Sequence, residues 1–177
     1  MVSAKYEGLP QWPRLLAAEQ EATDFKTSYA GTAVVLPLFR DVIACLEGDP
    51  AADLLHIALH GQVDPQGNDE GLVLLSLSAD GKYSAQYLQS QHIESVDLPN
   101  SPFVFLNACQ VGAGKQVLGD YAGLAAAFLR AGAAAVVAPL WNVDDGVASE
   151  IALEFYQRAL ADSPVPISEI LRDIRSR

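Results

Sequence analysis

Residues 103–109 read FVFLNAC, an apolar run that ends in an asparagine, an alanine and Cys109. A short run that is apolar at successive positions is typical of a strand buried on both faces of a parallel sheet. Residues 53–59 (DLLHIAL) and 133–138 (AAAVVA) have the same texture. The sequence therefore predicts at least three buried parallel strands.

The stretches between these strands have the features of helices and turns. Strands that alternate with helices predict an α/β fold, with helices on both faces of the sheet. Asp80-Gly81 lies between two strand-like runs and predicts a hairpin. The expected helices cover residues 15–26, 39–46, 83–91, 120–131, about 144–160 and 168–176, a short strand covers 32–36, and the hairpin strands include 71–78 and 82–83.

The composition is that of an ordinary globular domain, with 50% apolar and 19% charged residues in 177 positions. This length favours a single domain over residues 1–177. The net charge of −11 argues against nucleic acid and against an anionic membrane surface as partners. The apolar stretch 121–141 is interrupted by Arg130, Gly132 and Pro139. We interpret it as a buried helix and a buried strand, not as a membrane span.

The cysteine content and the N-terminus indicate the compartment. The two cysteines, Cys45 and Cys109, are too few for a disulfide scaffold and fit a reducing environment, although a single disulfide remains an alternative. Residues 1–7 (MVSAKYE) lack the basic start and apolar stretch of a signal peptide. We therefore expect a cytoplasmic protein, in which Cys45 serves as inert packing.

Two chemically reactive side chains lie at the ends of predicted strands. His60 and Gly61 follow one strand and Cys109 follows another, and sites in α/β sheets form at the carboxyl ends of strands. A thiol is mostly protonated at neutral pH, so a cysteine nucleophile needs a base such as imidazole. The backbone N–H groups of Gly61 and Cys109 are candidates to hold an oxyanion. Each residue alone is more often structural, but the pair at two strand ends favours catalysis.

Four ordered motifs extend this interpretation. They are residues 56–61 (HIALHG), 105–112 (FLNACQVG), 123–133 (GLAAAFLRAGA) and 140–145 (LWNVDD). The first two resemble the His-x-x-x-His-Gly and Asn/Ser-Ala-Cys-x-x-Gly motifs of the CHAT domain family, caspase-like domains of the clan that includes caspases, separase and gingipains. The other two are similar to the family's helix leading into a strand and to its Leu-Trp-x-Val-Asp-Asp segment. The resemblance extends over residues 15–158, most of the chain.

This resemblance implies a caspase-like three-layer α/β/α sandwich, with a mostly parallel sheet and a hairpin insertion. It implies that His60 and Cys109 form a catalytic dyad and that no cofactor is needed. Family members usually have a further strand before the first helix. Only a proline-containing stretch precedes Leu15, so we expect that edge strand to be absent. The family often carries helical repeats before this domain. We therefore expect the C-terminal part of a longer protein, with a regulatory helical-repeat domain or partner.

The polar residues after the third strand are candidates for a substrate pocket. Clan relatives that cut after Arg or Lys have an acidic residue near this place, so Asp144 or Asp145 is a candidate to select a basic side chain. Trp141 and Asn142 are candidates to line the same pocket. The alternative is that an aspartate caps the following helix and that Trp141 covers the core.

The two remaining histidines are His56 and His92. His56 and Asn107 are expected to brace the dyad from behind. On a strand, His56 and His60 lie about 13 Å apart, too far to share one metal ion, and we expect no metal site. His92 lies in a polar stretch and is expected to face solvent.

The loop after His60 contains three acidic residues, Asp64, Asp69 and Glu70. One of these carboxylates could orient the imidazole as the third member of a triad. In caspase-like dyads a backbone carbonyl often takes this place. We therefore favour a dyad.

Together these features predict a cysteine endopeptidase that acts on a protein or peptide substrate. One alternative is a latent or non-catalytic signalling module that binds a partner through the pocket or through a sheet edge left free by the absent strand. Another is a hydrolase of small esters or amides. The sequence does not predict the oligomeric state.

Overall fold

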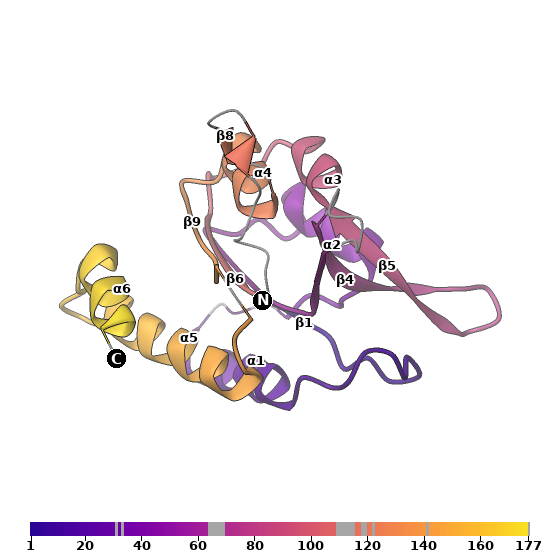
Figure 1. Cartoon of the computed structure of the whole chain (residues 1–177), viewed down its shortest axis with the longest axis horizontal. Coiled ribbons are helices and arrows are strands. Elements are labelled where there is room, and N and C mark those ends of the chain that lie inside the picture. The colour runs from indigo at the N-terminus through magenta and orange to yellow at the C-terminus, as the bar shows by residue number, and fades with distance from the viewer. Residues whose placement is uncertain are drawn as a thin grey trace.

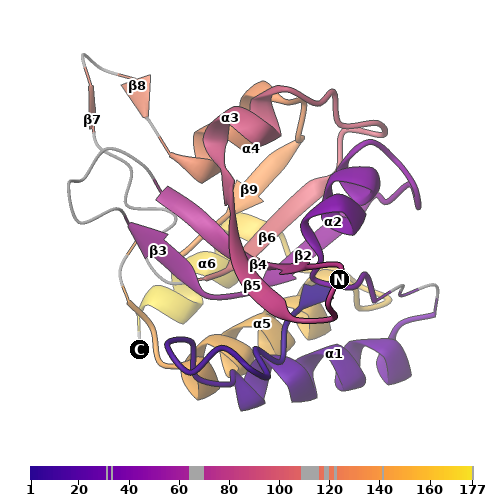
Figure 2. The ribbon, with the colours of Figure 1, turned by 90° about the vertical axis from the view of Figure 1, so that its right-hand side faces the viewer.

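The computed structural model describes residues 1–30, 32, 34–63, 70–108, 116–117, 120–121, 123–140 and 142–176. Its centre is a four-stranded parallel sheet with the order β1-β2-β6-β9 (Figures 1 and 2). The strands are β1 (Val2–Ser3), β2 (Leu54–Ala58), β6 (Phe103–Asn107) and β9 (Ala135–Val137). β2, β6 and β9 confirm the three predicted parallel strands, and β2 and β6 are buried as expected. β9 lies at the edge of the sheet and its residues are only half-buried.

A second, antiparallel sheet has the order β3-β4-β5. Its strands are β3 (Gly61–Val63), β4 (Glu70–Leu77) and β5 (Tyr83–Gln89), and β4 and β5 form the predicted hairpin. Gly81 has a φ of +79° at the turn, a conformation that glycine adopts without steric cost. A short antiparallel pair, β7 (Gln116–Val117) and β8 (Asp120–Tyr121), forms a third sheet.

Residues 83–91 do not form the predicted helix. They form β5 and the start of α3 (Ser90–Glu94). Every residue of β5 pairs with a residue of β4, from Tyr83 opposite Leu77 to Gln89 opposite Gly71. The hairpin ladder supplies the backbone hydrogen bonds of this stretch, and tertiary pairing overrides its weak helical pattern.

The expectation that the edge strand is absent is wrong. β1 pairs in parallel with β2, with Val2 opposite Ile57 and Ser3 opposite Ala58. A strand of two residues is too short to show an alternating pattern, so no local pattern predicts it. The edge of β2 is therefore covered.

The strand predicted at 32–36 is also wrong for its described residues, Thr32 and 34–36. Val35 makes a single parallel bridge to Val2, and its N–H donates to the carbonyl of Met1 at 2.8 Å. Pro37 follows directly and carries no N–H to extend the pairing. The segment therefore only touches the edge of β1.

Helices cover both faces of the central sheet. α1 (Leu16–Ser28), α5 (Asp145–Ala159) and α6 (Ile167–Arg175) lie on one side, and α2 (Phe39–Leu46), α3 and α4 (Leu124–Arg130) lie on the other (Figure 1). Each side has its own apolar cluster: Phe25, Phe105 and Phe155 belong to one, and Val42, Leu106 and Phe128 to the other. This arrangement confirms the three-layer α/β/α sandwich.

The helix predicted at 120–131 begins later than expected. Asp120 and Tyr121 belong to β8, and α4 starts at Leu124 after Gly123, whose φ is +116°. No helix in the described ranges is long and apolar enough to cross a membrane. The apolar stretch 121–141 contains the last residue of β8, the whole of α4 and the whole of β9.

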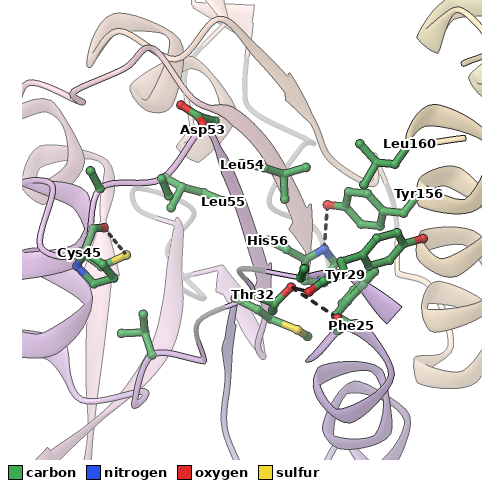
Figure 3. A pocket seen from close by; sticks show the side chains of 16 residues that line it. Phe25, Tyr29, Thr32, Cys45, Asp53, Leu54, Leu55, His56, Tyr156 and Leu160 are labelled. Atoms are coloured by element: carbon green, nitrogen blue, oxygen red, sulfur yellow. Dashed lines mark hydrogen bonds between the residues drawn. The ribbon is translucent and has the colours of Figure 1, made fainter. Parts of the chain in front are cut away.

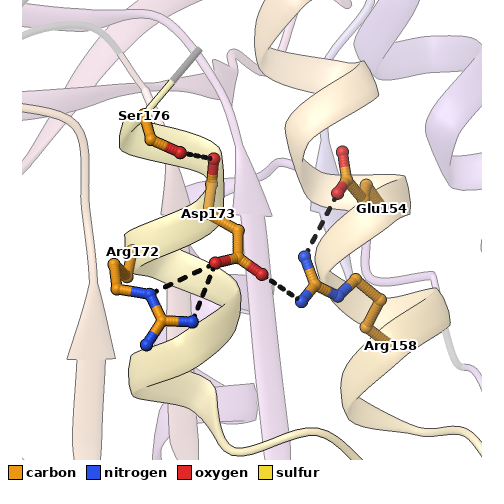
Figure 4. Close-up of polar contacts among 5 residues, drawn as sticks. All are labelled: Glu154, Arg158, Arg172, Asp173 and Ser176. Atoms are coloured by element: carbon orange, nitrogen blue, oxygen red, sulfur yellow. Dashed lines mark hydrogen bonds and ion pairs between the residues drawn. The ribbon is translucent and has the colours of Figure 1, made fainter.

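A cluster of charged side chains joins α5 to α6 (Figure 4). The Arg158 guanidinium of α5 lies 2.7 Å from the Asp173 carboxylate of α6 and 3.4 Å from Glu154 on its own helix. Arg172 lies 3.0 Å from the other oxygen of Asp173. Hydrogen bonds from Arg158 and Arg172 hold the pKa of the Asp173 carboxyl below its ordinary value.

Candidate active site

His60 and Asn107 lie at the same end of the central sheet, where the parallel strands β2 and β6 terminate. β2 and β6 are parallel neighbours, and Ala58 at the end of β2 is opposite Asn107 at the end of β6. His60 and Cys109 each follow this pair by two positions in their own segments. Cys109 itself lies outside the described residues. The register therefore brings His60 close to the end of β6, which lies two positions before Cys109 in the sequence.

A backbone carbonyl holds the His60 ring. Nε2 of His60 lies 2.7 Å from the carbonyl oxygen of Pro13. Because a carbonyl only accepts hydrogen bonds, Nε2 carries the proton at this contact. In the neutral ring the lone pair is then on Nδ1, the nitrogen available to act as a base. The acidic residues Asp64 and Asp69 of the loop, considered as alternatives, lie outside the described residues.

Two aromatic side chains flank the imidazole. The ring centroids of Tyr6 and Trp12 lie 4.8 and 5.3 Å from that of His60. The Tyr6 hydroxyl accepts a hydrogen bond from the His60 backbone N–H at 3.0 Å and donates to the Val73 carbonyl at 2.8 Å. Burial raises the pKa of the Tyr6 hydroxyl well above its ordinary value, so the group stays a donor. Tyr6 thus fixes both the backbone and the ring of His60.

The sequence analysis missed this support from the N-terminal segment. Tyr6, Trp12 and Pro13 precede the first helix in a stretch without periodicity. One available signal was the clustering of two aromatic residues in a short segment between the start of the chain and α1. Gly61, the other predicted oxyanion donor, begins β3 opposite Leu72.

The two residues expected to brace the dyad meet at a third residue, Glu21. Nε2 of His56 lies 3.0 Å from Oε1 of Glu21, and the Asn107 amide donates to Oε2 of Glu21 at 3.2 Å. The His56–Glu21 contact is short but not aligned as a hydrogen bond. On its other side, Nδ1 of His56 lies 3.0 Å from the Tyr156 hydroxyl. α1, β2, β6 and α5 each contribute one member of this cluster.

Glu21 was not expected at the site because an acidic residue of a surface helix normally faces water. It nevertheless follows Ala18 by three positions and precedes Phe25 by four, and all three residues are buried. That spacing places them on one face of α1. A carboxylate on the apolar face of a helix was therefore the available signal.

The two histidines have different surroundings. The His56 ring packs among Phe25, Phe105 and Tyr156, at centroid distances of 5.0 to 5.6 Å, and His60 packs against Tyr6 and Trp12. His56 and Tyr156 also line a cavity of about 490 Å³ near the amino end of β2 (Figure 3). In the part of the chain that the structure describes, no three His, Cys, Asp or Glu side chains gather as metal ligands.

The predicted pocket residues Asp144 and Asp145 bind backbone N–H groups. Oδ1 of Asp144 accepts from the N–H groups of Gly146 and Val147 at 3.0 and 3.3 Å, which confirms that Asp144 caps α5. Oδ2 of Asp145 accepts from the Ala17 N–H at 2.9 Å and ties α5 to the first turn of α1. Asn142 is exposed, and Trp141 lies outside the described residues. A pocket role for these four positions stays a prediction.

Two smaller expectations have different outcomes. His92 does not simply face solvent: it is half-buried, its Nδ1 accepts from the Gln89 N–H at 3.0 Å, and its ring lies 5.1 Å from that of Phe39. Cys45 is a buried free thiol, and burial raises its pKa. That environment makes a thiol unreactive and agrees with a packing role.

Comparisons with known proteins identify a family for this chain. No curated protein matches the chain. Residues 7–177 match the family model described as the CHAT domain. The matched range includes His60 and the residues Trp12 and Pro13 that contact its ring. It also includes the buried cluster of Glu21, His56, Asn107 and Tyr156. The chain belongs to the CHAT domain family, which is related to the caspase-like peptidases.

Proposed function

We propose that this protein is a cysteine endopeptidase of the caspase type, with His60 as the base and Cys109 as the nucleophile. The observation that carries the proposal is the His60 ring, whose Nε2 contacts the Pro13 carbonyl. The ring lies at the end of the sheet where β6 ends, two positions before Cys109 in the sequence. That contact leaves Nδ1 as the basic nitrogen. The family relationship to caspase-like peptidases supports the same chemistry.

In the proposed reaction, Nδ1 of His60 takes the proton from the Cys109 thiol. The thiolate attacks the peptide carbonyl, and the N–H groups of Gly61 and Cys109 stabilise the resulting oxyanion. The imidazolium then gives its proton to the leaving amine, and a thioester remains on Cys109. Water hydrolyses the thioester with His60 acting again as the base. Throughout, the Pro13 carbonyl holds Nε2–H and stabilises the positive charge on the ring.

We further propose that the substrate carries a basic residue before the cut. The chain has 22 acidic and 11 basic residues, so its field attracts a cationic peptide. Asp144 and Asp145, with Trp141 and Asn142, are the residues proposed to form the pocket.

Cleavage of a diverse peptide library, read by mass spectrometry, tests this function. Wild type should cut peptides, and Cys109→Ala and His60→Ala should each lose cleavage by a factor of 100 or more, about the size of a general-base or nucleophile effect. Cuts after Arg or Lys that Asp144→Asn or Asp145→Asn weakens would support the basic pocket. Equal cleavage by wild type and Cys109→Ala would overturn the mechanism.

The structure weakens one argument for the alternative of a non-catalytic binding module. That alternative relied on a free sheet edge beside β2, and β1 covers this edge. A partner of the pocket itself, or an attached helical-repeat domain, remains compatible with the peptidase as a regulator of its activity. We place the protein in the cytoplasm, where its buried thiol Cys45 would stay reduced.

A further inference from the structure

The Glu21 carboxylate is fully buried, although it lies on a helix whose other face is open to water. Transfer of a carboxylate from water into a protein interior is costly unless charged or polar partners compensate for the loss of hydration. A leucine at this position would continue the apolar face formed by Ala18 and Phe25. The proposed reaction does not use Glu21, so its burial needs another explanation.

Each oxygen of the carboxylate faces a different strand. Oε1 faces Nε2 of His56 on β2 at 3.0 Å, and Oε2 accepts from the Asn107 amide on β6 at 3.2 Å. His56 and Asn107 do not oppose one another, because His56 is opposite Phe105 and Ala58 is opposite Asn107. Glu21 therefore joins two strands diagonally, across a step of two residues.

The Tyr156 hydroxyl sets the protonation pattern of this cluster. Burial first, and the charge of Glu21 second, raise the pKa of Tyr156 far above its ordinary value, so the hydroxyl remains protonated. It can donate to Nδ1 of His56, which lies 3.0 Å away. A neutral His56 ring then carries its proton on Nε2, at the contact with Glu21. The carboxylate thus faces a donor at each oxygen.

The contact between Glu21 and Asn107 matters because Asn107 lies close to Cys109 in the sequence. Asn107 is the last residue of β6, and Cys109 follows it by two positions. The backbone of β6 is paired on both sides up to Phe105, but only with β2 at Leu106 and Asn107. Among the described residues, the Asn107 side chain is bound to Glu21 of α1, which supplies a fixed point on this less supported end.

We propose that Glu21 is a positioning residue, which holds Asn107 and thereby the end of β6 that presents Cys109 to His60. This inference rests on the proposed dyad but concerns a residue outside it. Catalytic groups must be held to within a fraction of an ångström, and a misplacement of 1 Å can cost about 100-fold in rate. The support of His60 does not depend on Glu21, because His60 is held by Tyr6 and by the Pro13 carbonyl.

The test measures the reactivity of Cys109 directly, without requiring peptide cleavage. Iodoacetamide alkylation of the full chain is followed from pH 5 to 9, with peptide mapping to separate Cys109 from Cys45. The test variant is Glu21→Gln, which keeps the size of the side chain. The matched control is Asp24→Asn on the same helix, whose carboxylate accepts from Gln20 at an exposed position. Thermal unfolding shows that each variant is folded.

We expect Glu21→Gln to react about 10-fold more slowly at Cys109 at neutral pH and to shift the midpoint of its pH profile upward, whereas Asp24→Asn follows wild type. Where peptides are cleaved, kcat should fall with KM nearly unchanged. Asn107→Ala should reproduce the loss and serves as the second variant if Glu21→Gln does not fold. A folded Glu21→Gln or Asn107→Ala with the wild-type alkylation profile would overturn the inference.

The same experiment separates this inference from the proposed function. A Cys109 that reacts rapidly in a His60-dependent way and is slowed by Glu21→Gln, without any peptide cleavage, would contradict the peptidase but support the positioning role. Peptide cleavage that is unaffected by Glu21→Gln and Asn107→Ala would contradict the positioning role alone. Ordinary, His60-independent reactivity of Cys109 in wild type would contradict both.

Discussion

At the scale of single residues, each half of the candidate dyad depends on a support that lies elsewhere in the sequence. His60 takes its orientation from Tyr6 and Pro13, and the segment of Cys109 follows Asn107, which Glu21 binds. The supports come from the N-terminal segment and from α1. Both halves are thus held by groups that lie outside the four sequence motifs.

Tyr6→Phe tests the support of His60. The change removes the hydroxyl that bridges the His60 N–H and the Val73 carbonyl, and the two backbone groups lose a partner in a buried place. We expect the free energy of unfolding to fall by about 1–3 kcal/mol, measured by urea denaturation, and His60-dependent activity to fall with it. Tyr83→Phe, in the exposed part of the hairpin, is the control. An unchanged unfolding free energy in Tyr6→Phe would show that the hydrogen bonds of the Tyr6 hydroxyl do not stabilise the fold.

At the scale of elements, β1 has only two residues, yet we expect a substitution in it to lower the free energy of unfolding. Val2 is buried and pairs with β2, the strand that leads into His60. Val2→Ala removes apolar contacts from this edge and should lower the free energy of unfolding by about 1–3 kcal/mol. Val34→Ala, at an exposed position nearby in the chain, should stay close to wild type. Chemical denaturation compares the two, and equal stabilities would argue that β1 does not hold the sheet edge.

The charged cluster between α5 and α6 predicts a pH dependence. The pKa of Asp173 lies below its ordinary value of 3.8 because Arg158 and Arg172 bind its charged form. A carboxyl with a lowered pKa in the folded state stabilises the fold at pH values above its unfolded pKa, and the benefit is lost as the pH falls through the folded value. Because Arg158 and Asp173 are only partly buried and Arg172 is exposed, water screens these charges. We therefore expect Asp173→Asn to lower the melting temperature by less than about 3 °C at pH 7.

Thermal unfolding from pH 2 to 7 checks this linkage. The difference between wild type and Asp173→Asn should shrink as the pH falls below 3.8, and it should also shrink at high salt because surface charges are screened. A difference that stays constant across the whole pH range would mean that packing, not charge, causes it.

Buried apolar runs predicted the central elements well, because a strand such as β6 shows its burial in its own sequence. The errors lie where a longer-range contact decides the structure. β1 consists of two residues whose pairing with β2 has no local pattern, and β5 is a strand because β4 lies beside it. In both cases a partner distant in sequence supplies the hydrogen bonds, and local propensity is silent or misleading.

The candidate site follows the same rule. His60 was predicted because a His-Gly pair ends an apolar run, a signal contained in adjacent residues. Glu21 was missed because its role depends on His56 and Asn107, which are far from it in sequence. The prediction of a brace from His56 and Asn107 named two members of the cluster but not the carboxylate that joins them.

At the scale of the whole molecule, the two layers of helices have different tasks. The layer of α1, α5 and α6 supplies Glu21 and Tyr156, which bind the polar residues of β2 and β6. The opposite layer belongs to a larger apolar cluster that includes the hairpin strands. The sheet between them places the residues that lead into His60 beside the end of β6, which precedes Cys109 in the sequence. The account of function therefore depends on a single claim, that His60 activates Cys109.

The measurement that tests this claim most directly is the pH profile of Cys109 alkylation in wild type and His60→Ala. Cys45 is separated by peptide mapping, and thermal unfolding confirms that both proteins are folded. If His60 is the base, wild-type Cys109 should react rapidly at pH 6 to 7, whereas in His60→Ala its rate should follow an ordinary thiol with a midpoint near about 8.5. Coincident profiles in the two proteins would contradict the dyad and with it the proposed peptidase.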